Sequence, residues 1–324
     1  MKPTIIASLA AIVLGWTIAS AQDTDSRFMR PFTENFSNNP PEYFKTKGSD
    51  LRYYSGVHSM TEEGTDVLLM RISPTDPPGG GRGPEICSLK STHFGSYSTR
   101  IRIPEVKPVQ PDAGIVVGYF TYLFTRGYGL SEIDIEWLVA DPELVYLGCW
   151  TSDPENIENL QHIGRTVNLA TGQILYTNYR SYHDGDDDHP FTDKASTSPE
   201  TIPAIEGFNA AERFYTYGFD WYPDRMIWWI EHPVTGEKII LWDYTGTTPR
   251  YSGIPQSPSA YLLNFWHTED WPAATNPNSV ETPKYPYFLE VDWMRYEPFD
   301  DLNIKWRKDH NWIQQPKIPF WSAP

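Results

Sequence analysis

The sequence predicts an all-β protein, a β-sandwich or barrel assembled from short strands. Many segments alternate apolar and polar residues with the period of two that a half-buried strand requires. Turn-forming Gly, Pro and Asp residues separate these segments, and no amphipathic helical pattern longer than a few turns is present. Because no repeat or change in composition divides the chain, we expect one domain over residues 22–299.

The expected strands follow one another along the whole domain. In chain order they cover residues 51–57, 66–72, 94–103, 114–124, 130–139, 145–150, 173–182, 214–221, 226–231, 238–242, 260–267 and 288–296. We interpret the acidic stretch 183–189 as a solvated turn, because its spacing matches no calcium-binding loop well. Residues 300–324 contain three Trp residues and are expected to pack along the domain as a tail.

The first residues have the pattern of a secretory signal. Lys2 is followed by an apolar run over residues 5–18 and by Ala19-Ser20-Ala21, a typical cleavage pattern. We therefore expect residues 1–21 to be removed and the protein to be secreted to the extracellular side. In an oxidising compartment Cys87 and Cys149 could form one disulfide; the alternative is two separately buried thiols.

The net charge of −16, with a pI near 4.9, restricts the possible partners. Nucleic acids, anionic membranes and acidic polysaccharides would be repelled, so a neutral substrate is expected. Aromatic residues make up 15% of the chain, including 13 Trp and 20 Tyr, and the flat apolar faces of sugars pack on such rings. We expect a monomer that binds a polysaccharide, with no nucleic acid and no membrane as partner.

One short stretch, Ser131–Trp137, stands apart from the other strands. Its acids alternate with apolar residues, so Glu132, Asp134 and Glu136 share one face of the strand. Acids are poor strand formers, and three of them in a row on one face repel one another. Such a cost is expected where the acids have a function.

Cleavage of a glycosidic bond requires two carboxyl groups, one to protonate the leaving oxygen and one to attack or stabilise the anomeric carbon. The Cα atoms of Glu132 and Glu136 lie roughly 13 Å apart along an ideal strand, so their side chains must lean together. Asp134, between them, can hydrogen-bond one neighbour and hold a shared proton. A solvated strand face and a set of metal ligands are the alternatives. The strand looks central rather than peripheral, and it contains no histidine.

Residues 132–136 match the Glu-x-Asp-x-Glu signature of glycoside hydrolase family 16, which includes lichenases, laminarinases, xyloglucan-active enzymes and fungal cell-wall glucanases. The resemblance covers most of residues 90–297 in the right order. Its further segments are Phe94-Gly95-Ser96-Tyr97, Gly114-Ile115-Val116, Tyr119-Phe120-Thr121-Tyr122, Tyr217-Gly218-Phe219-Asp220-Trp221, Pro223-Asp224-Arg225, Asn264-Phe265-Trp266 and Val291-Asp292-Trp293-Met294-Arg295-Tyr296.

The resemblance implies a concanavalin A-like jelly roll of two curved antiparallel sheets, with the cleft on the concave sheet. It implies that Glu132 is the nucleophile, Glu136 the general acid/base and Asp134 the assisting acid, with no cofactor required for catalysis. Asp292 matches a position that often binds a structural calcium on the convex side. The substrate-binding positions that it implies are Phe120, Tyr122, Trp266, Asn264 and Arg100.

The chain also departs from the family pattern. Members commonly have Trp and Asp where this chain has Leu130 and Ser131, which leaves the substrate open. No extra residue separates Asp134 from Glu136, and a regular strand without a bulge favours the lichenase and xyloglucan side of the family. Two segments, 147–151 and 176–180, compete for the strand that follows the catalytic one.

The resulting expectation is a secreted, retaining endo-β-glucanase that hydrolyses a neutral β-1,3/β-1,4-linked polysaccharide by double displacement. Two alternatives remain. The same residues could serve a transglycosylase that remodels cell walls, and the same fold could carry a non-catalytic lectin. The presence of all three acids argues against the lectin.

Overall fold

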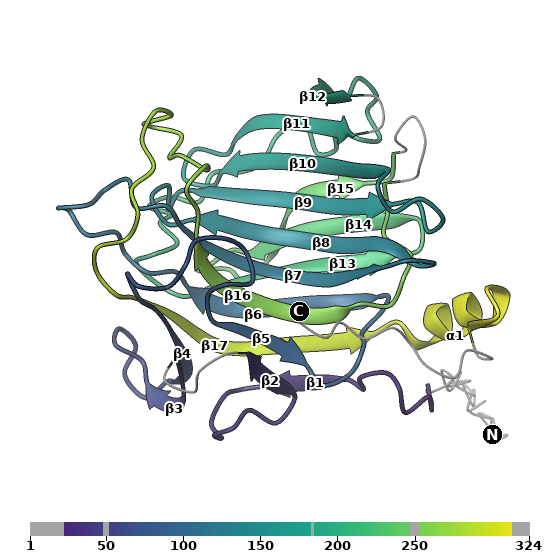
Figure 1. Cartoon of the computed structure of the whole chain (residues 1–324), viewed down its shortest axis with the longest axis horizontal. Helices are drawn as coiled ribbons and strands as arrows, with labels where there is room; N and C mark the ends of the chain where they lie inside the picture. The colour runs from purple at the N-terminus through teal and green to yellow at the C-terminus, as the bar shows by residue number, and fades with distance from the viewer. Residues whose placement is uncertain (1–22, 48–51, 183–184, 247–252, 313–324) are drawn as a thin grey trace, which may run out of the picture.

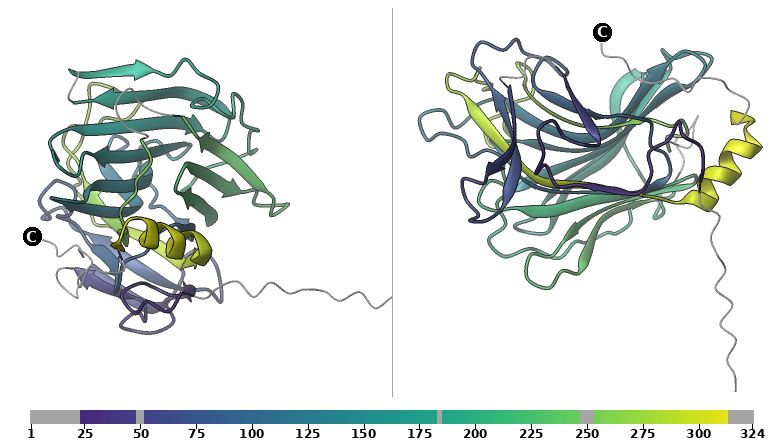
Figure 2. Two further views of the ribbon diagram at one scale, coloured as in Figure 1. Left: turned by 90° about the vertical axis from the view of Figure 1, so that its right-hand side faces the viewer. Right: turned by 90° about the horizontal axis from the view of Figure 1, so that it is seen from below.

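The computed structural model describes residues 23–47, 52–182, 185–246 and 253–312. Two antiparallel sheets stack face to face in this part of the chain, and one helix lies at the end of the stack (Figures 1 and 2). The predicted all-β sandwich is therefore confirmed. The expected signal over residues 1–21, and Trp321 of the expected tail, lie outside the described residues.

The front layer in Figure 1 is a nine-stranded sheet, here called the acid sheet, in the order β12-β11-β10-β9-β8-β7-β16-β5-β2. Its strands are β2 (Phe44–Lys47), β5 (Glu85–Ser88), β7 (Ile115–Thr125), β8 (Gly129–Leu138), β9 (Leu144–Ser152), β10 (Leu160–Asn168), β11 (Gln173–Ser181), β12 (Gly185–Pro190) and β16 (Ala260–His267).

The second sheet lies behind the acid sheet in the order β15-β14-β13-β6-β17-β4-β3, with β1 paired to β17. Its strands are β1 (Phe32–Glu34), β3 (Tyr53–His58), β4 (Asp66–Ile72), β6 (Gly95–Arg102), β13 (Tyr215–Tyr222), β14 (Arg225–Glu231), β15 (Lys238–Tyr244) and β17 (Tyr287–Pro298). Two late strands thus sit inside the sheets: β16 pairs with β7 and β5, and β17 pairs with β6 and β4.

Every strand expected from the alternation pattern is present, but β1, β2, β5, β10 and β12 were not expected. In β10 the pattern is broken by Arg165, whose side chain is only 1% exposed and lies on the core face. Its guanidinium donates hydrogen bonds to the carbonyl oxygens of Thr197, Pro199 and Leu241. The interpretation of 183–189 as a turn is wrong for its second part, because β12 begins at Gly185 and pairs with β11.

The core between the sheets anchors the acidic strand β8. Ile133 and Ile135 are fully buried there, on the face of β8 opposite the acids. From the second sheet, the buried indole N–H of Trp228 donates a 3.0 Å hydrogen bond to the backbone carbonyl oxygen of Asp134. Trp228 is itself stacked on Trp242, with ring centroids 4.9 Å apart. The backbone of the acidic strand is therefore fixed by a contact from the second sheet.

Helix α1 (Asp300–Asp309) follows β17 directly and packs on the end of the sandwich (Figure 2). Trp306 is 8% exposed and donates through its indole N–H to Gln256, while the Asn303 amide donates to the Phe94 carbonyl oxygen. Acids in its first turn and bases in its last turn suit the helix dipole. The described part of the chain contains no helix long and apolar enough to span a membrane.

Replacing Trp228 by Phe removes the hydrogen bond to Asp134 and leaves unfilled volume in the core. We expect the free energy of unfolding to fall by about 1–3 kcal/mol. Urea denaturation followed by circular dichroism measures this change. The half-buried loop residue Trp271 supplies the control, since Trp271→Phe should change stability by less than about 0.5 kcal/mol. Equal stability of Trp228→Phe and the wild type would contradict the anchoring role.

Candidate active site

The three acids lie on β8, the middle strand of the acid sheet. Hydrogen-bonded neighbours on both sides fix their register: Glu132 lies opposite Tyr122 of β7 and Trp150 of β9. The pairing of β8 with β7 runs without a shift from Gly129 to Leu138. The strand is therefore central and free of a bulge, as the sequence predicts.

The environment of the acids changes their protonation. Burial raises the pKa of Glu132 to about 8 and that of Glu136 to about 7. Burial also holds the pKa of Asp134 well above its ordinary value, and the charges of both glutamates add to this effect. The repulsion means that the three carboxyls titrate as one set. The pKa of Glu132 lies above that of Glu136, so the expected roles of Glu132 as nucleophile and Glu136 as proton donor rest on the resemblance and not on these pKa values.

One flank of the acids is a cavity of about 800 Å³ in which three of the predicted substrate-binding residues meet: Phe120, Tyr122 and Asn264. It reaches Glu132 directly. The cavity is lined by Lys47, Gly80, Gly81, Arg82, Glu85, Phe120, Tyr122, Phe124, Glu132, Leu262 and Asn264. Trp266, the fourth predicted residue, lies two positions beyond Asn264 on the same face of β16 and opposite Val116.

Asn264 is held in place by a glycine and an acid. A Cβ atom at Gly118, its partner on β7, would lie 2.5 Å from Asn264 Oδ1, so any larger residue here would displace the Asn264 side chain. On the other side lies Glu85 of β5, which is 2% exposed. Burial raises the pKa of Glu85 to about 7, and the Lys47 ammonium and a hydrogen bond from Asn264 counteract part of that rise. Sequence reasoning missed Glu85, because one acid in a four-residue strand produces no periodic signal.

The other flank of the acids is aromatic. Trp150 lies beside Glu132 and stacks on His162 of β10, with ring centroids 4.3 Å apart. Tyr146 lies beside Glu136 and packs edge-to-face with Trp271, with ring centroids 4.8 Å apart. The competition between segments 147–151 and 176–180 is thus resolved: β9 adjoins β8, and β11 lies two strands further along the same sheet.

Arg100 does not lie near the acids. It belongs to β6 in the second sheet, where its neighbours Thr99 and Ile101 point into the core and Arg100 points outward. Its guanidinium donates to Asp292 at 2.6 Å and to Glu62 at 2.7 Å. The expectation that Arg100 contacts substrate in the cleft is wrong, because the side-chain period of β6 places it on the opposite side of the molecule.

Asp292 does not have the surroundings of a calcium site. Calcium takes six to eight oxygen ligands, whereas the Asp292 carboxylate faces the positive charge of Arg100. No group of three or more acidic, His or Cys residues that could hold a metal occurs among the described residues. The guanidinium therefore occupies the place where a cation was expected.

The expected disulfide between Cys87 and Cys149 is not formed, and both thiols are free and buried. Cys149 pairs with Ile133 and shares its core face, whereas Cys87 packs with Phe120 on the acid face. Four strand spacings, roughly 19 Å, separate their strands. A disulfide requires Cα atoms less than about 7 Å apart, so these two cysteines cannot be joined.

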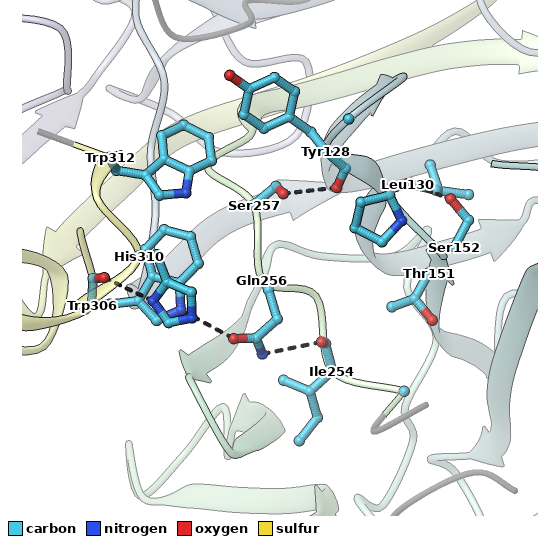
Figure 3. Close-up of a pocket in the computed structure, with 13 residues that line it drawn as sticks. Tyr128, Leu130, Thr151, Ser152, Ile254, Gln256, Ser257, Trp306, His310 and Trp312 are labelled. Carbon is cyan, nitrogen blue, oxygen red and sulfur yellow. Dashed lines mark hydrogen bonds between the residues drawn. The ribbon is translucent and has the colours of Figure 1, made fainter. Parts of the chain in front are cut away.

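A second cavity, of about 590 Å³, lies at the end of the sandwich between the β7–β8 turn and α1 (Figure 3). Its polar groups bond to one another: Ser257 donates to the Tyr128 carbonyl, and Gln256 joins Trp306 to Ile254. It includes none of the three acids. We therefore place the candidate active site on the acid face of β8 and not in this cavity.

Comparison with known proteins finds related sequences and a similar fold. Residues 52–294 match the sequence profile of the family described as glycosyl hydrolases family 16. A beta-glucanase of Bacillus amyloliquefaciens is 24% identical over 308 residues, which cover 90% of this chain and 96% of that protein. A beta-glucanase of Bacillus licheniformis is 26% identical over 242 residues, covering 72% and 70%.

A solved structure reported with endo-acting O-glycanases of the human gut microbiota has the same fold. It matches with a TM-score of 0.51 at 15% sequence identity, covering 89% of this chain and 97% of that one. This similarity concerns the fold alone. Together with the family match, it confirms the expected jelly roll of two antiparallel sheets.

A reducing agent should not change the stability of the protein, because the two cysteines lie on opposite faces of the acid sheet. We expect the thermal unfolding midpoint to agree within error with and without dithiothreitol. Thiol titration in denaturant should find both cysteines reactive before reduction. Thiols that become reactive only after reduction would contradict the structure.

Asp134→Asn removes one of the three mutually repelling carboxyls at nearly constant shape. The folded wild type retains these protons where the unfolded chain has released them, so its stability falls as the pH rises from about 4 to about 8. The free energy of unfolding of the variant should decrease less between pH 4 and pH 8. The variant should therefore be more stable than the wild type by about 1–2 kcal/mol at pH 8, with little difference at pH 4. Urea denaturation across this range measures the effect. Parallel pH profiles for the two proteins would show that Asp134 is not under charge strain.

Proposed function

The chain belongs to glycosyl hydrolases family 16, and from this premise we propose that it is a secreted, retaining endo-β-glucanase acting on a neutral β-1,3/β-1,4-linked polysaccharide. The observation that supports this most directly is the set of three buried carboxyls on one face of β8. The set lies between a cavity and an aromatic flank on the same sheet. The beta-glucanase relatives support the same reaction class.

In the proposed first step Glu136 donates its proton to the glycosidic oxygen while Glu132 attacks the anomeric carbon. The bond to the leaving sugar breaks, and a covalent glycosyl-enzyme forms on Glu132. In the second step Glu136, now ionised, takes a proton from water, and the resulting hydroxyl displaces Glu132. The configuration at the anomeric carbon is retained because it is inverted twice.

Asp134 separates the two glutamates along the strand and supports both roles. Its strongly raised pKa means that it carries a proton when its neighbours are ionised. A protonated Asp134 can donate a hydrogen bond to the ionised Glu132 and so stabilise the attacking form. When Glu132 becomes esterified and loses its charge, this hydrogen bond weakens. Asp134 can then donate its hydrogen bond to the ionised Glu136 instead.

The rest of the proposal rests on charge and on the N-terminal pattern. A net charge of −16 favours a neutral polysaccharide over acidic glycans, nucleic acids or anionic membranes. The cavity on one side of the acids and the aromatic residues on the other could both contact sugar units. A polysaccharide bound on both sides would be cleaved internally. Residues 1–21 have the composition of an export signal. We further propose that the protein acts as a monomer, with catalysis carried by its own carboxyls.

Two amide substitutions distinguish the roles of the glutamates. Glu132→Gln should lower kcat by at least about 10³-fold on every substrate, because no nucleophile remains. Glu136→Gln should be similarly impaired on polysaccharide, yet form the glycosyl-enzyme readily from an aryl β-glycoside whose leaving group needs no protonation. The measurements are reducing-end release from laminarin and mixed-linkage β-glucan, and phenol release from the aryl glycoside.

Asp292→Asn is the matched control, since Asp292 lies on the outer face of the second sheet and its loss should leave kcat unchanged. NMR of the first product should show the β-anomer. Formation of longer oligosaccharides in place of reducing ends would favour the transglycosylase. Glycan binding without turnover by the wild type would favour the lectin and refute the proposed hydrolysis.

A further inference from the structure

The loop that follows β1 contains the sequence Asn35-Phe36-Ser37. Asn-x-Ser/Thr, with any residue except Pro in the middle, is the acceptor pattern for N-linked glycans in secreted proteins. No other Asn among the 324 residues is followed by Ser or Thr at this spacing. The three residues line neither the cavity beside Glu132 nor the cavity at α1, so the proposed reaction does not account for them.

The loop exposes the acceptor asparagine and buries the residue next to it. Phe36 is fully buried and packs against Phe44 of β2, with ring centroids 6.2 Å apart. Asn35 and Ser37, on either side of Phe36, are exposed. The next three residues, 38–40, are exposed as well. The folded protein therefore has room at its surface for a bulky group attached to Asn35.

The side chain of Asn35 leaves its nitrogen free for chemistry. The backbone N–H of Ser37 donates to Asn35 Oδ1 at 3.2 Å, and the Ser37 hydroxyl donates to the same oxygen at 2.8 Å. A backbone N–H can only donate, so the atom that it faces is the amide oxygen, and the other atom is the nitrogen. Within the part of the chain that the structure describes, Nδ2 donates to no other residue.

Contacts with the second sheet hold this turn in place. Phe36 has a positive φ of 52°, which bulky residues seldom adopt. Its N–H donates to Glu34 Oε1 at 3.0 Å, and its carbonyl oxygen accepts a 2.8 Å hydrogen bond from the Ser55 hydroxyl of β3. A Cβ atom at Gly56 would lie 2.9 Å from the Ser37 carbonyl oxygen, so the turn lies directly against β3. The acceptor geometry is thus part of the fold.

The turn lies at the edge of the sandwich, away from the acids. It follows β1 of the second sheet and precedes β2, the outermost strand of the acid sheet, both at the lower edge of Figure 1. Four strand spacings, roughly 19 Å, separate β2 from β8. None of residues 35–43 lines the cavity beside Glu132. A glycan on Asn35 would therefore leave the candidate active site open.

We propose that Asn35 is a modification site that carries an N-linked glycan in the exported protein. The inference rests on the export part of the proposed function. In the transfer, Asn35 Nδ2 forms a bond to C1 of the first sugar of a lipid-pyrophosphate-linked oligosaccharide, while the bond from C1 to the pyrophosphate oxygen breaks. The pyrophosphate leaves with the electron pair, and the amide nitrogen gives one of its two protons to a base of the transferase.

The test expresses the full chain in a eukaryotic secretory host and measures its mass before and after treatment with a peptide N-glycosidase. The wild type should lose the mass of one glycan. Asn35→Gln and Ser37→Ala should abolish this loss, whereas Ser37→Thr, which keeps the hydroxyl, should preserve it. Asn38→Gln is the matched control: it changes an exposed asparagine of the same loop outside the acceptor pattern and should keep the glycan.

Secreted wild-type protein without a removable glycan would overturn the proposal, and so would a glycan that persists in Asn35→Gln. Protein retained in the cells is analysed in the same way, so that a variant that folds poorly is still scored. If residues 1–21 do not export the chain, the export part of the proposed function fails separately. The comparison is then repeated with the leader of an established secreted protein. Loss of the glycan in Asn35→Gln but not in Asn38→Gln supports the site, and an unglycosylated wild type refutes it.

Discussion

The structure depends on holding three carboxyl groups in a row that their mutual repulsion tends to disperse. The neighbouring strands β7 and β9 fix β8 from both sides, and Ile133 and Ile135 fix it from the core. The hydrogen bond from Trp228 to the Asp134 carbonyl adds a contact from the other sheet. The backbone cannot move away from this buried position. Burial, and to a smaller extent the repulsion, therefore raises the pKa values of Glu132 and Asp134.

The same constraint explains why glycine and aromatic residues surround the acids. Gly118 and Gly148 flank Glu136 and Asp134 in the register, where a side chain would collide with Asn264 or crowd His162. The aromatic rings of Trp150 and Tyr146 lie beside the acids on β9. The result is a poorly solvated surface that raises the pKa values of the three acids, at a cost in folding stability at pH values above the pKa values of the unfolded chain.

Much of this could be predicted from the sequence, because a period of two assigns the faces of a strand that is long enough. The resemblance, and not the period, implied Phe120, Tyr122, Asn264 and Trp266 as cleft positions, and the structure places all four on the acid face. Glu85, Trp150 and His162 were missed or left open, since their nearness to β8 depends on strand order, which alternation does not encode. Arg100 and the cysteines were misplaced for the same reason: resemblance and spacing do not indicate which sheet or face a residue occupies.

The position of β16 and β17 has a consequence for how the protein is made. These strands come from the last part of the chain, yet β16 sits between β5 and β7 and β17 between β4 and β6. Neither sheet can form all its strand pairs before the ribosome has synthesised residues 260–298. Folding of the two sheets therefore waits until residues 260–298 are available, as expected where most contacts are distant in sequence. A fragment ending before β16 would expose five unpaired strand edges, on β1, β4, β5, β6 and β7, and be prone to aggregate.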